Sequence, residues 1–253
     1  ADTGGTMSVS GPNWSNVGGS IVENGGSLTL GGTITLANLN LAGGFTRTGG
    51  TVTLAGVLDN TGNTLALNGS TGTFVLAGGT IKGGTVSDSG GVLPTFATNS
   101  SSTFDSVLLD ANLTVAANHQ VFVQNGLTLK NGRTLTLDGS SSYSDLVFMS
   151  SQTLQAEAGG TAEVIFGGTG SAGRIFENSS VDVLTIASNM TIHGTQGGQI
   201  GLGRGLVNQG TILADTAGKT LTISGSTQTV SGVTVGTFEN QGTVQARYQN
   251  RKT

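Results

Sequence analysis

The sequence predicts an all-β protein, a right-handed parallel β-helix (β-solenoid) that forms a single elongated domain with degenerate coils. The main observation is the pattern Gly-x-(Thr/Ser)-Leu-x-(Leu/Ile)-x-Gly, which occurs at residues 25–32, 62–69, 132–139 and 218–225. Two apolar residues two apart, with glycine at both ends, indicate a short strand that buries one face and turns sharply at each end. The copies start 37, 70 and 86 residues apart, which is typical of coils that carry loops of different length.

Composition supports a folded β protein with a narrow core. Charged residues make up 9% of the chain, against about 25% in ordinary globular proteins, and 44 of the 253 residues are glycine. No window of ten residues is free of interior glycine and crowded β-branched residues, so we expect no helix. Aromatic residues are 5% of the chain, so the core should be mainly aliphatic.

Short strands are expected along most of the chain, each with two apolar side chains on one face. We expect coils of about 20 to 25 residues, and therefore about ten to twelve of them. The apolar pairs include Leu28/Leu30, Ile34/Leu36, Leu39/Leu41, Val52/Leu54, Leu65/Leu67, Phe74/Leu76, Val107/Leu109, Leu113/Val115, Val121/Val123, Leu127/Leu129, Leu135/Leu137, Val181/Val183, Met190/Ile192, Ile200/Leu202, Leu221/Ile223 and Val233/Val235.

A second repeat points to the corners. Residues 207–212 (Val-Asn-Gln-Gly-Thr-Ile) return 32 residues later as 239–244 (Glu-Asn-Gln-Gly-Thr-Val). This pattern predicts a turn that leads into a strand. Asparagines at repeated corners can stack and bond to one another, so we expect Asn208 and Asn240 to form part of a ladder.

The organisation along the chain follows from this pattern. Residues 1–24 are the least regular and contain Trp14, and we predict an N-terminal cap or irregular segment there. A sugar-stacking platform is the functional alternative for Trp14. Residues 25–246 are the predicted β-solenoid, and residues 247–253 are a basic C-terminal tail or a truncation point.

Several classes of function lack their sequence signature. The chain has no cysteine, so disulfides and thiol chemistry are excluded. It has no basic stripe for nucleic acid, and no apolar run of 18 residues that could span a bilayer. The first residues, Ala1-Asp2-Thr3, match a mature chain after signal cleavage, so we expect a secreted, extracellular or cell-surface protein.

The titratable residues do not form a recognisable catalytic motif. A polysaccharide hydrolase of this fold needs an acid and a base about 6.5–9.5 Å apart. His193 precedes Gly194, but no Asp pair or basic motif accompanies it, and His119 has no better company. We interpret His193 as an ordinary residue at a strand end. Carboxylates that meet a base in one groove would favour an enzyme instead.

Metal and ice binding are also weighed against ordinary roles. Calcium needs several converging carboxylates, whereas Asp59, Asp88 and Asp110 are widely spread, so we predict no metal, cofactor or catalytic site. Thr-x-Thr pairs recur at irregular intervals. An ice-binding ladder needs one copy per coil on one face, so we interpret these threonines as the solvent side of strands.

Residues 46–54 (Thr-Arg-Thr-Gly-Gly-Thr-Val-Thr-Leu) and 76–86 (Leu-Ala-Gly-Gly-Thr-Ile-Lys-Gly-Gly-Thr-Val) carry a resemblance to known proteins. They resemble the Gly/Thr/Asn-rich β-helical repeat regions of large secreted bacterial surface proteins, the autotransporter passengers and filamentous-haemagglutinin-like adhesins. The resemblance covers most of residues 25–246 and is one of style. It implies a right-handed β-helix exported to the cell surface as a stalk, adhesin or matrix element, and it assigns no functional residue.

We therefore expect a non-enzymatic, extracellular structural or adhesive β-solenoid module. Open strand edges at the ends of such a rod favour association into fibres. The expected partners are other copies, bound end to end or laterally, or a host or cell-surface glycan. The alternative is a β-helix protein that binds or cleaves polysaccharide.

Overall fold

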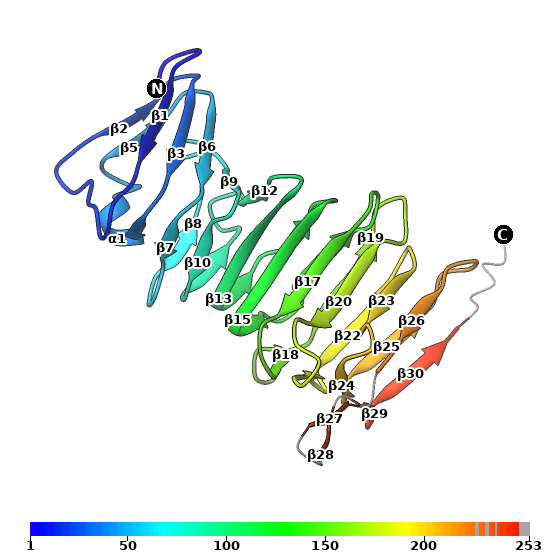
Figure 1. Ribbon diagram of the computed structural model, residues 1–253. Coiled ribbons are helices and arrows are strands. Elements are labelled where there is room, and N and C mark those ends of the chain that lie inside the picture. The colour runs from blue at the N-terminus through cyan, green and yellow to red at the C-terminus, as the bar shows by residue number, and fades with distance from the viewer. Residues whose placement is uncertain (226–227, 231–232, 236, 248–253) are drawn as a thin grey trace.

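The chain forms a parallel β-solenoid of about nine turns, which confirms the predicted fold class. The computed structural model describes residues 1–225, 228–230, 233–235 and 237–247. The coils follow one another from the N-terminal end to the C-terminal end (Figure 1). Strands make up 53% of the structure and helix 2%, as expected from the scarcity of glycine-free windows.

Three parallel sheets form most of the sides of the coils. We call them sheets I, II and III. Sheet I contains five strands near the N-terminal end, namely β1 (Thr6–Val9), β3 (Ser27–Leu30), β6 (Thr51–Leu54), β9 (Phe74–Leu76) and β12 (Thr95–Phe96). Sheet III contains six strands, namely β14 (Leu113–Val115), β16 (Thr134–Asp138), β19 (Ala162–Gly167), β22 (Met190–Gly194), β25 (Thr211–Ala214) and β30 (Thr243–Ala246).

Sheet II has 15 strands and runs almost the whole length of the solenoid. Its main path contains β4 (Thr33–Thr35), β7 (Val57–Asp59), β10 (Thr80–Lys82), β13 (Ser100–Asp110), β15 (His119–Leu129), β17 (Ser144–Phe148), β20 (Gly173–Glu177), β23 (Gly198–Ile200) and β26 (Leu221–Ile223). Its second path contains β8 (Thr64–Ala66), β11 (Thr85–Ser87), β18 (Gln152–Ala156), β21 (Val183–Ile186), β24 (Gly205–Asn208) and β29 (Phe238–Asn240). The long strands β13 and β15 belong to both paths.

Sheets I and III lie on the same side of the solenoid. Strand β12 of sheet I packs next to β14 of sheet III, and each directly precedes a long strand of sheet II. Two further pairs stand apart: β2 (Ile21–Glu23) pairs in parallel with β5 (Phe45–Arg47), and β27 (Gln228–Val230) pairs antiparallel with β28 (Val233–Val235). The first strands of the stack thus lie within residues 1–24.

The core consists of rows of apolar side chains that run along the solenoid. In sheet I, Leu28 is in register with Val52, and Leu30 is in register with Leu54. All four are at most 1% exposed, because alternate residues of each short strand point inward. The buried side chains are mainly Leu, Val and Ile, with Phe74, Phe104, Phe148 and Phe166 filling wider places, so the predicted aliphatic core is confirmed.

The four copies of the eight-residue pattern form strands on different sides of the solenoid. They supply β3 of sheet I, β8 and β26 of sheet II and β16 of sheet III. Leu65 and Leu67 are at most 1% exposed and Ala66 is half-buried, as predicted. The spacings between copies share no period because the copies do not occupy equivalent positions in their coils.

The number of turns is lower than the ten to twelve predicted, because the later coils are longer. Ser27 is in register with Thr51, 24 residues on, whereas Asn208 is paired with Asn240, 32 residues on. The extra residues lie in loops at the corners. They lengthen each coil without adding a turn.

Asparagine and glycine build the corners. The predicted ladder is confirmed, since Asn208 Nδ2 donates to Asn240 Oδ1 at 2.8 Å and to the Thr243 carbonyl at 3.2 Å. Asn60 is likewise buried and donates to the backbone of the next coil. Gly84 has φ +65°, and a Cβ there would lie 2.1 Å from the Asn60 carbonyl oxygen, so only glycine fits.

One turn of helix, α1 (Leu36–Leu39), interrupts the strands and corrects two predicted pairs. Thr35 caps it by accepting from the Asn38 amide, and Asn40 ends it in the left-handed conformation. Leu36 and Leu39 therefore do not belong to strands. The prediction of no helix failed here because local side-chain capping outweighs the low helix propensity of a short segment.

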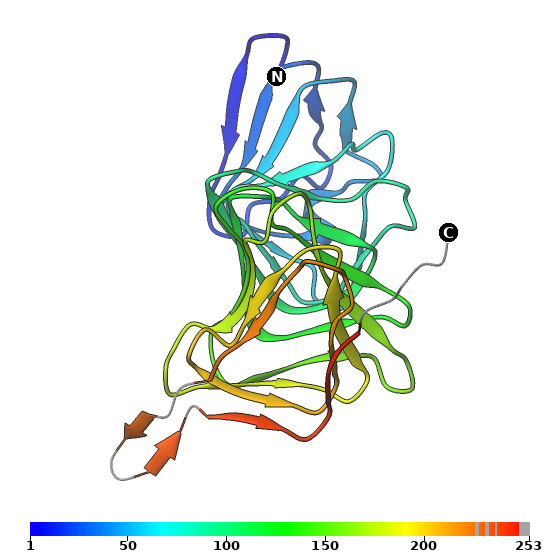
Figure 2. The same ribbon diagram turned by 90° about the vertical axis from the view of Figure 1, so that its right-hand side faces the viewer.

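Three other predicted pairs are also wrong. Val181 precedes β21 and is 46% exposed, while Leu184 and Ile186 point inward, because strand register with the previous coil decides which face is buried. Leu202 lies beyond the end of β23. Val233 and Val235 belong to the antiparallel hairpin β27–β28, which extends away from the stacked coils (Figure 2).

Candidate functional site

His193 has closer charged neighbours than the sequence indicated. It is the fourth residue of β22 and points outward, because Ile192 points into the core. Its Nε2 lies 3.5 Å from Glu163 Oε2, and its Nδ1 lies 3.3 Å from Asp215 Oδ2. The imidazole occupies the space between the two carboxylates, where an inverting hydrolase needs room for its water. When protonated, His193 ties three coils together.

His119 is a core residue. Its side chain is fully buried, its Nδ1 lies 2.7 Å from the Ala97 carbonyl oxygen, and its ring packs 4.7 Å from that of Phe96. Burial lowers the pKa of the imidazole, only partly offset by the Ala97 carbonyl, so the ring is neutral near pH 7. His119 lies at the start of sheet II and has no carboxylate bonded to it.

The three aspartates weighed as calcium ligands are bound to cations of this chain. Arg133 bonds to both Asp88 and Asp110, and Asp110 also accepts from Lys130 at 3.0 Å. Partial burial raises the pKa of the Asp110 carboxyl, but the hydrogen bonds from Lys130 and Arg133 outweigh it and hold the pKa below its ordinary value. Asp59 lies 3.6 Å from Lys82. Among the described residues, no three His, Asp or Glu side chains gather in a way that could hold a metal ion.

A second buried ion pair lies on the outer face of sheet II. Asp145 is fully buried, and it accepts from Arg174 Nε at 2.6 Å and from Gln120 at 2.8 Å. The Arg174 guanidinium also lies over the rings of Tyr143 and Phe176, at 5.9 and 5.7 Å from their centroids. The sequence did not indicate this cluster, because its partners are 25 to 29 residues apart.

Threonine and serine form two outward rows on sheet I. Thr6, Ser27 and Thr51 are in register, as are the residues two further on in each strand. The other Thr-x-Thr pairs lie on different sides of the solenoid. The prediction that these pairs are too irregular for a ladder is therefore wrong for the first three coils of sheet I, where serine completes the rows.

Trp14 is half-buried against the core and donates from Nε1 to the Gly31 carbonyl at 2.9 Å. This contact joins the loop between β1 and β2 to the next coil. The basic cluster predicted at the C-terminus lies mostly outside the described residues, apart from Arg247.

The two end coils expose positions that are buried elsewhere. Met7 continues the inward row of Leu28 and Val52, yet it is 49% exposed. At the other end, Val244 continues the inward row of Ile212 and is 46% exposed. These residues are exposed because no further coil packs over them in this chain.

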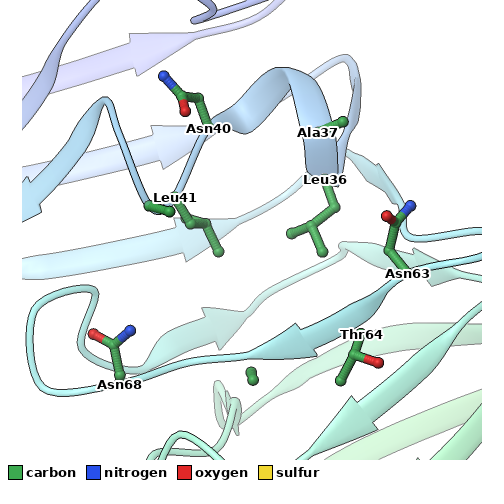
Figure 3. Close-up of a pocket in the computed structure, with 9 residues that line it drawn as sticks. Leu36, Ala37, Asn40, Leu41, Asn63, Thr64 and Asn68 are labelled. Atoms are coloured by element: carbon green, nitrogen blue, oxygen red, sulfur yellow. The ribbon is translucent and has the colours of Figure 1, made fainter.

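A groove lies between α1 and strand β8 (Figure 3). Its volume is about 360 Å³, within the range of ligand pockets. Leu36 and Leu41 point from the helical side toward the β8 segment, where Thr64 and Asn68 lie (Figure 3). The lining is uncharged throughout and consists of Leu36, Ala37, Asn40, Leu41, Ala42, Asn63, Thr64, Ala66 and Asn68.

No helix among the described residues is long and apolar enough to cross a membrane. The chain matches no protein-family model, no curated protein sequence and no solved structure.

Proposed function

We propose that this chain is a non-enzymatic, extracellular structural or adhesive module whose end coils associate with other copies to form fibres. The observation that carries the proposal is the exposure of core-row residues at both ends, Met7 at one and Val244 at the other. An exposed core row next to an unpaired strand edge is a template for a further coil.

The two end strands have matching patterns. Residues 6–9 of β1 read Thr-Met-Ser-Val, and residues 243–246 of β30 read Thr-Val-Gln-Ala. Both strands belong to the same side of the solenoid, and each pairs with one neighbour only. Placed side by side in parallel, they put Met7 beside Val244 and continue the core row from one copy to the next. Such a head-to-tail contact does not close, so it produces an open filament.

Sedimentation at increasing protein concentration, together with electron microscopy of the same samples, tests this proposal. We expect the wild type to form filaments and Val244→Asp to remain monomeric, because an unpaired charge cannot be buried in the contact. Val181→Asp is the matched control, since Val181 is equally exposed but lies away from the ends. A wild type that stays monomeric at every concentration, or a Val244→Asp variant that assembles like the wild type, contradicts the proposal.

A second candidate is binding or cleavage of polysaccharide, and the observation that favours it is the placement of His193 between Glu163 and Asp215. Release of reducing ends from neutral and acidic polysaccharides, measured for the wild type and for Glu163→Gln and Asp215→Asn, tests cleavage. Release by the wild type that both variants abolish would support an enzyme. No release from any substrate would leave the structural proposal as the better one.

A further inference from the structure

Strand β8 has an open edge in the middle of the solenoid wall. On one side it pairs with β11, with Thr64 opposite Thr85 and Ala66 opposite Ser87. On the other side, the preceding coil has α1 and a loop where a strand would lie, and no described strand pairs with β8 there. This edge therefore differs from those of the end coils, because stacked coils lie on both sides of it.

The backbone groups at this edge are identified by the pairing with β11. The Thr85 amide donates to the Asn63 carbonyl at 2.9 Å, which fixes the phase of the ladder. Successive residues of a strand direct their amide and carbonyl to opposite sides, so Leu65 faces β11 while Thr64 and Ala66 face the groove. Their two amides and two carbonyls need partners that the described part of the chain does not supply.

The spacing of these groups selects a ligand. Thr64 and Ala66 are two residues apart, so equivalent groups recur about every 6.6 Å along the edge, the repeat of an extended backbone. A second strand matches this repeat at every donor and acceptor. The apolar side chains of Leu36 and Leu41 project into the same space, and no charged residue lines it.

We propose that the groove between α1 and β8 binds an uncharged, extended peptide segment, which adds to the edge of β8 as a further strand. The peptide backbone bonds to Thr64 and Ala66, and an aliphatic side chain of the peptide packs against Leu36 and Leu41. The amide side chains of Asn63 and Asn68 lie at the two ends of the bound segment. Main-chain bonding gives affinity in this mode, and the apolar contact gives specificity.

Fluorescence anisotropy with a labelled Thr-Ile-Thr-Val-Thr peptide, capped at both ends, tests the proposal. We expect saturable binding to the wild-type chain. The same peptide N-methylated at its central residues should bind at least about tenfold more weakly, because each lost backbone hydrogen bond costs on the order of 1 kcal/mol. Hydrogen exchange should show new protection at residues 64–66 when the unmodified peptide is bound, which separates this site from the end strands.

Two variants complete the experiment. Ala37→Trp fills the groove from an exposed position of α1, and it should abolish the protection at residues 64–66. Ala158→Trp is the matched control, because Ala158 is also exposed but lines a different groove, and it should bind like the wild type. Equal binding of the N-methylated peptide, unchanged protection in Ala37→Trp, or displacement of the peptide by a neutral glucan oligosaccharide overturns the proposal.

Discussion

Glu177 makes the stability of the solenoid depend on pH in an unusual direction. It is the last residue of β20, its side chain is fully buried, and neither carboxyl oxygen has a hydrogen-bond partner. Burial raises the pKa of Glu177 from 4.5 to about 8, the charge of Asp182 raises it further, and Arg204 opposes the change. The folded protein thus carries this carboxyl in its neutral form near pH 7.

The sign and size of the effect follow from the two pKa values. Between pH 4.5 and about 8 the folded state keeps a proton that the unfolded state has lost. The free energy of unfolding therefore falls as the pH rises through this window, by up to about 1.4 kcal/mol per pH unit, and levels off above it. The total loss is about 5 kcal/mol at most, for a pKa difference of this size.

The Glu177→Gln variant removes this titration while keeping the shape of the side chain. We expect the variant to be more stable than the wild type by about 3 kcal/mol at pH 7, and the two to converge as the pH falls toward 4.5. Urea unfolding followed by circular dichroism across a pH series measures the difference. Glu239→Gln is the control, because Glu239 is exposed. If the wild type and Glu177→Gln change in parallel with pH, the buried neutral carboxyl is not the cause.

Three further outcomes are expected. Leu65→Asp should unfold or fray the neighbouring coils, because it buries an unpaired charge, whereas Ala66→Asp should leave the thermal midpoint within a few degrees; equal melts for the two contradict the assigned faces. Asn208→Ala should lower the free energy of unfolding by about 1–3 kcal/mol in urea titrations, because it leaves buried backbone groups of the next coil without a donor. Arg133→Met should cost about 1 kcal/mol or less in the same assay, because the pairs with Asp88 and Asp110 are partly exposed; a much larger loss would mean that this cluster holds the corner together.

The sequence was sufficient to predict the type of fold, because apolar residues two apart and glycines at corners are local signals. Leu65 and Ala66 illustrate this, since their faces follow from the alternation alone. The side of the solenoid on which each strand lies depends on loop lengths, which set the register between coils. Val181 was placed on the wrong face for this reason.

The candidate sites could not be predicted in the same way. Arg133 and Asp88 are 45 residues apart, and His193 meets Glu163 and Asp215 only because three coils are in register. The groove beside β8 depends on a strand that is replaced by α1, and Thr35 and Asn40 are the only local signs of that helix turn. Interactions between coils leave no spacing pattern when coil length varies from 24 to 32 residues.

The same variation in coil length sets how the molecule would respond to mechanical load. A pull on the two termini acts along the stack and peels coils from the ends, so chain is released in discrete steps. A coil of 24 residues adds about 80 Å of extended chain and one of 32 residues about 110 Å. In a single-molecule stretching trace, the N-terminal and C-terminal ends would therefore be told apart by the size of their steps.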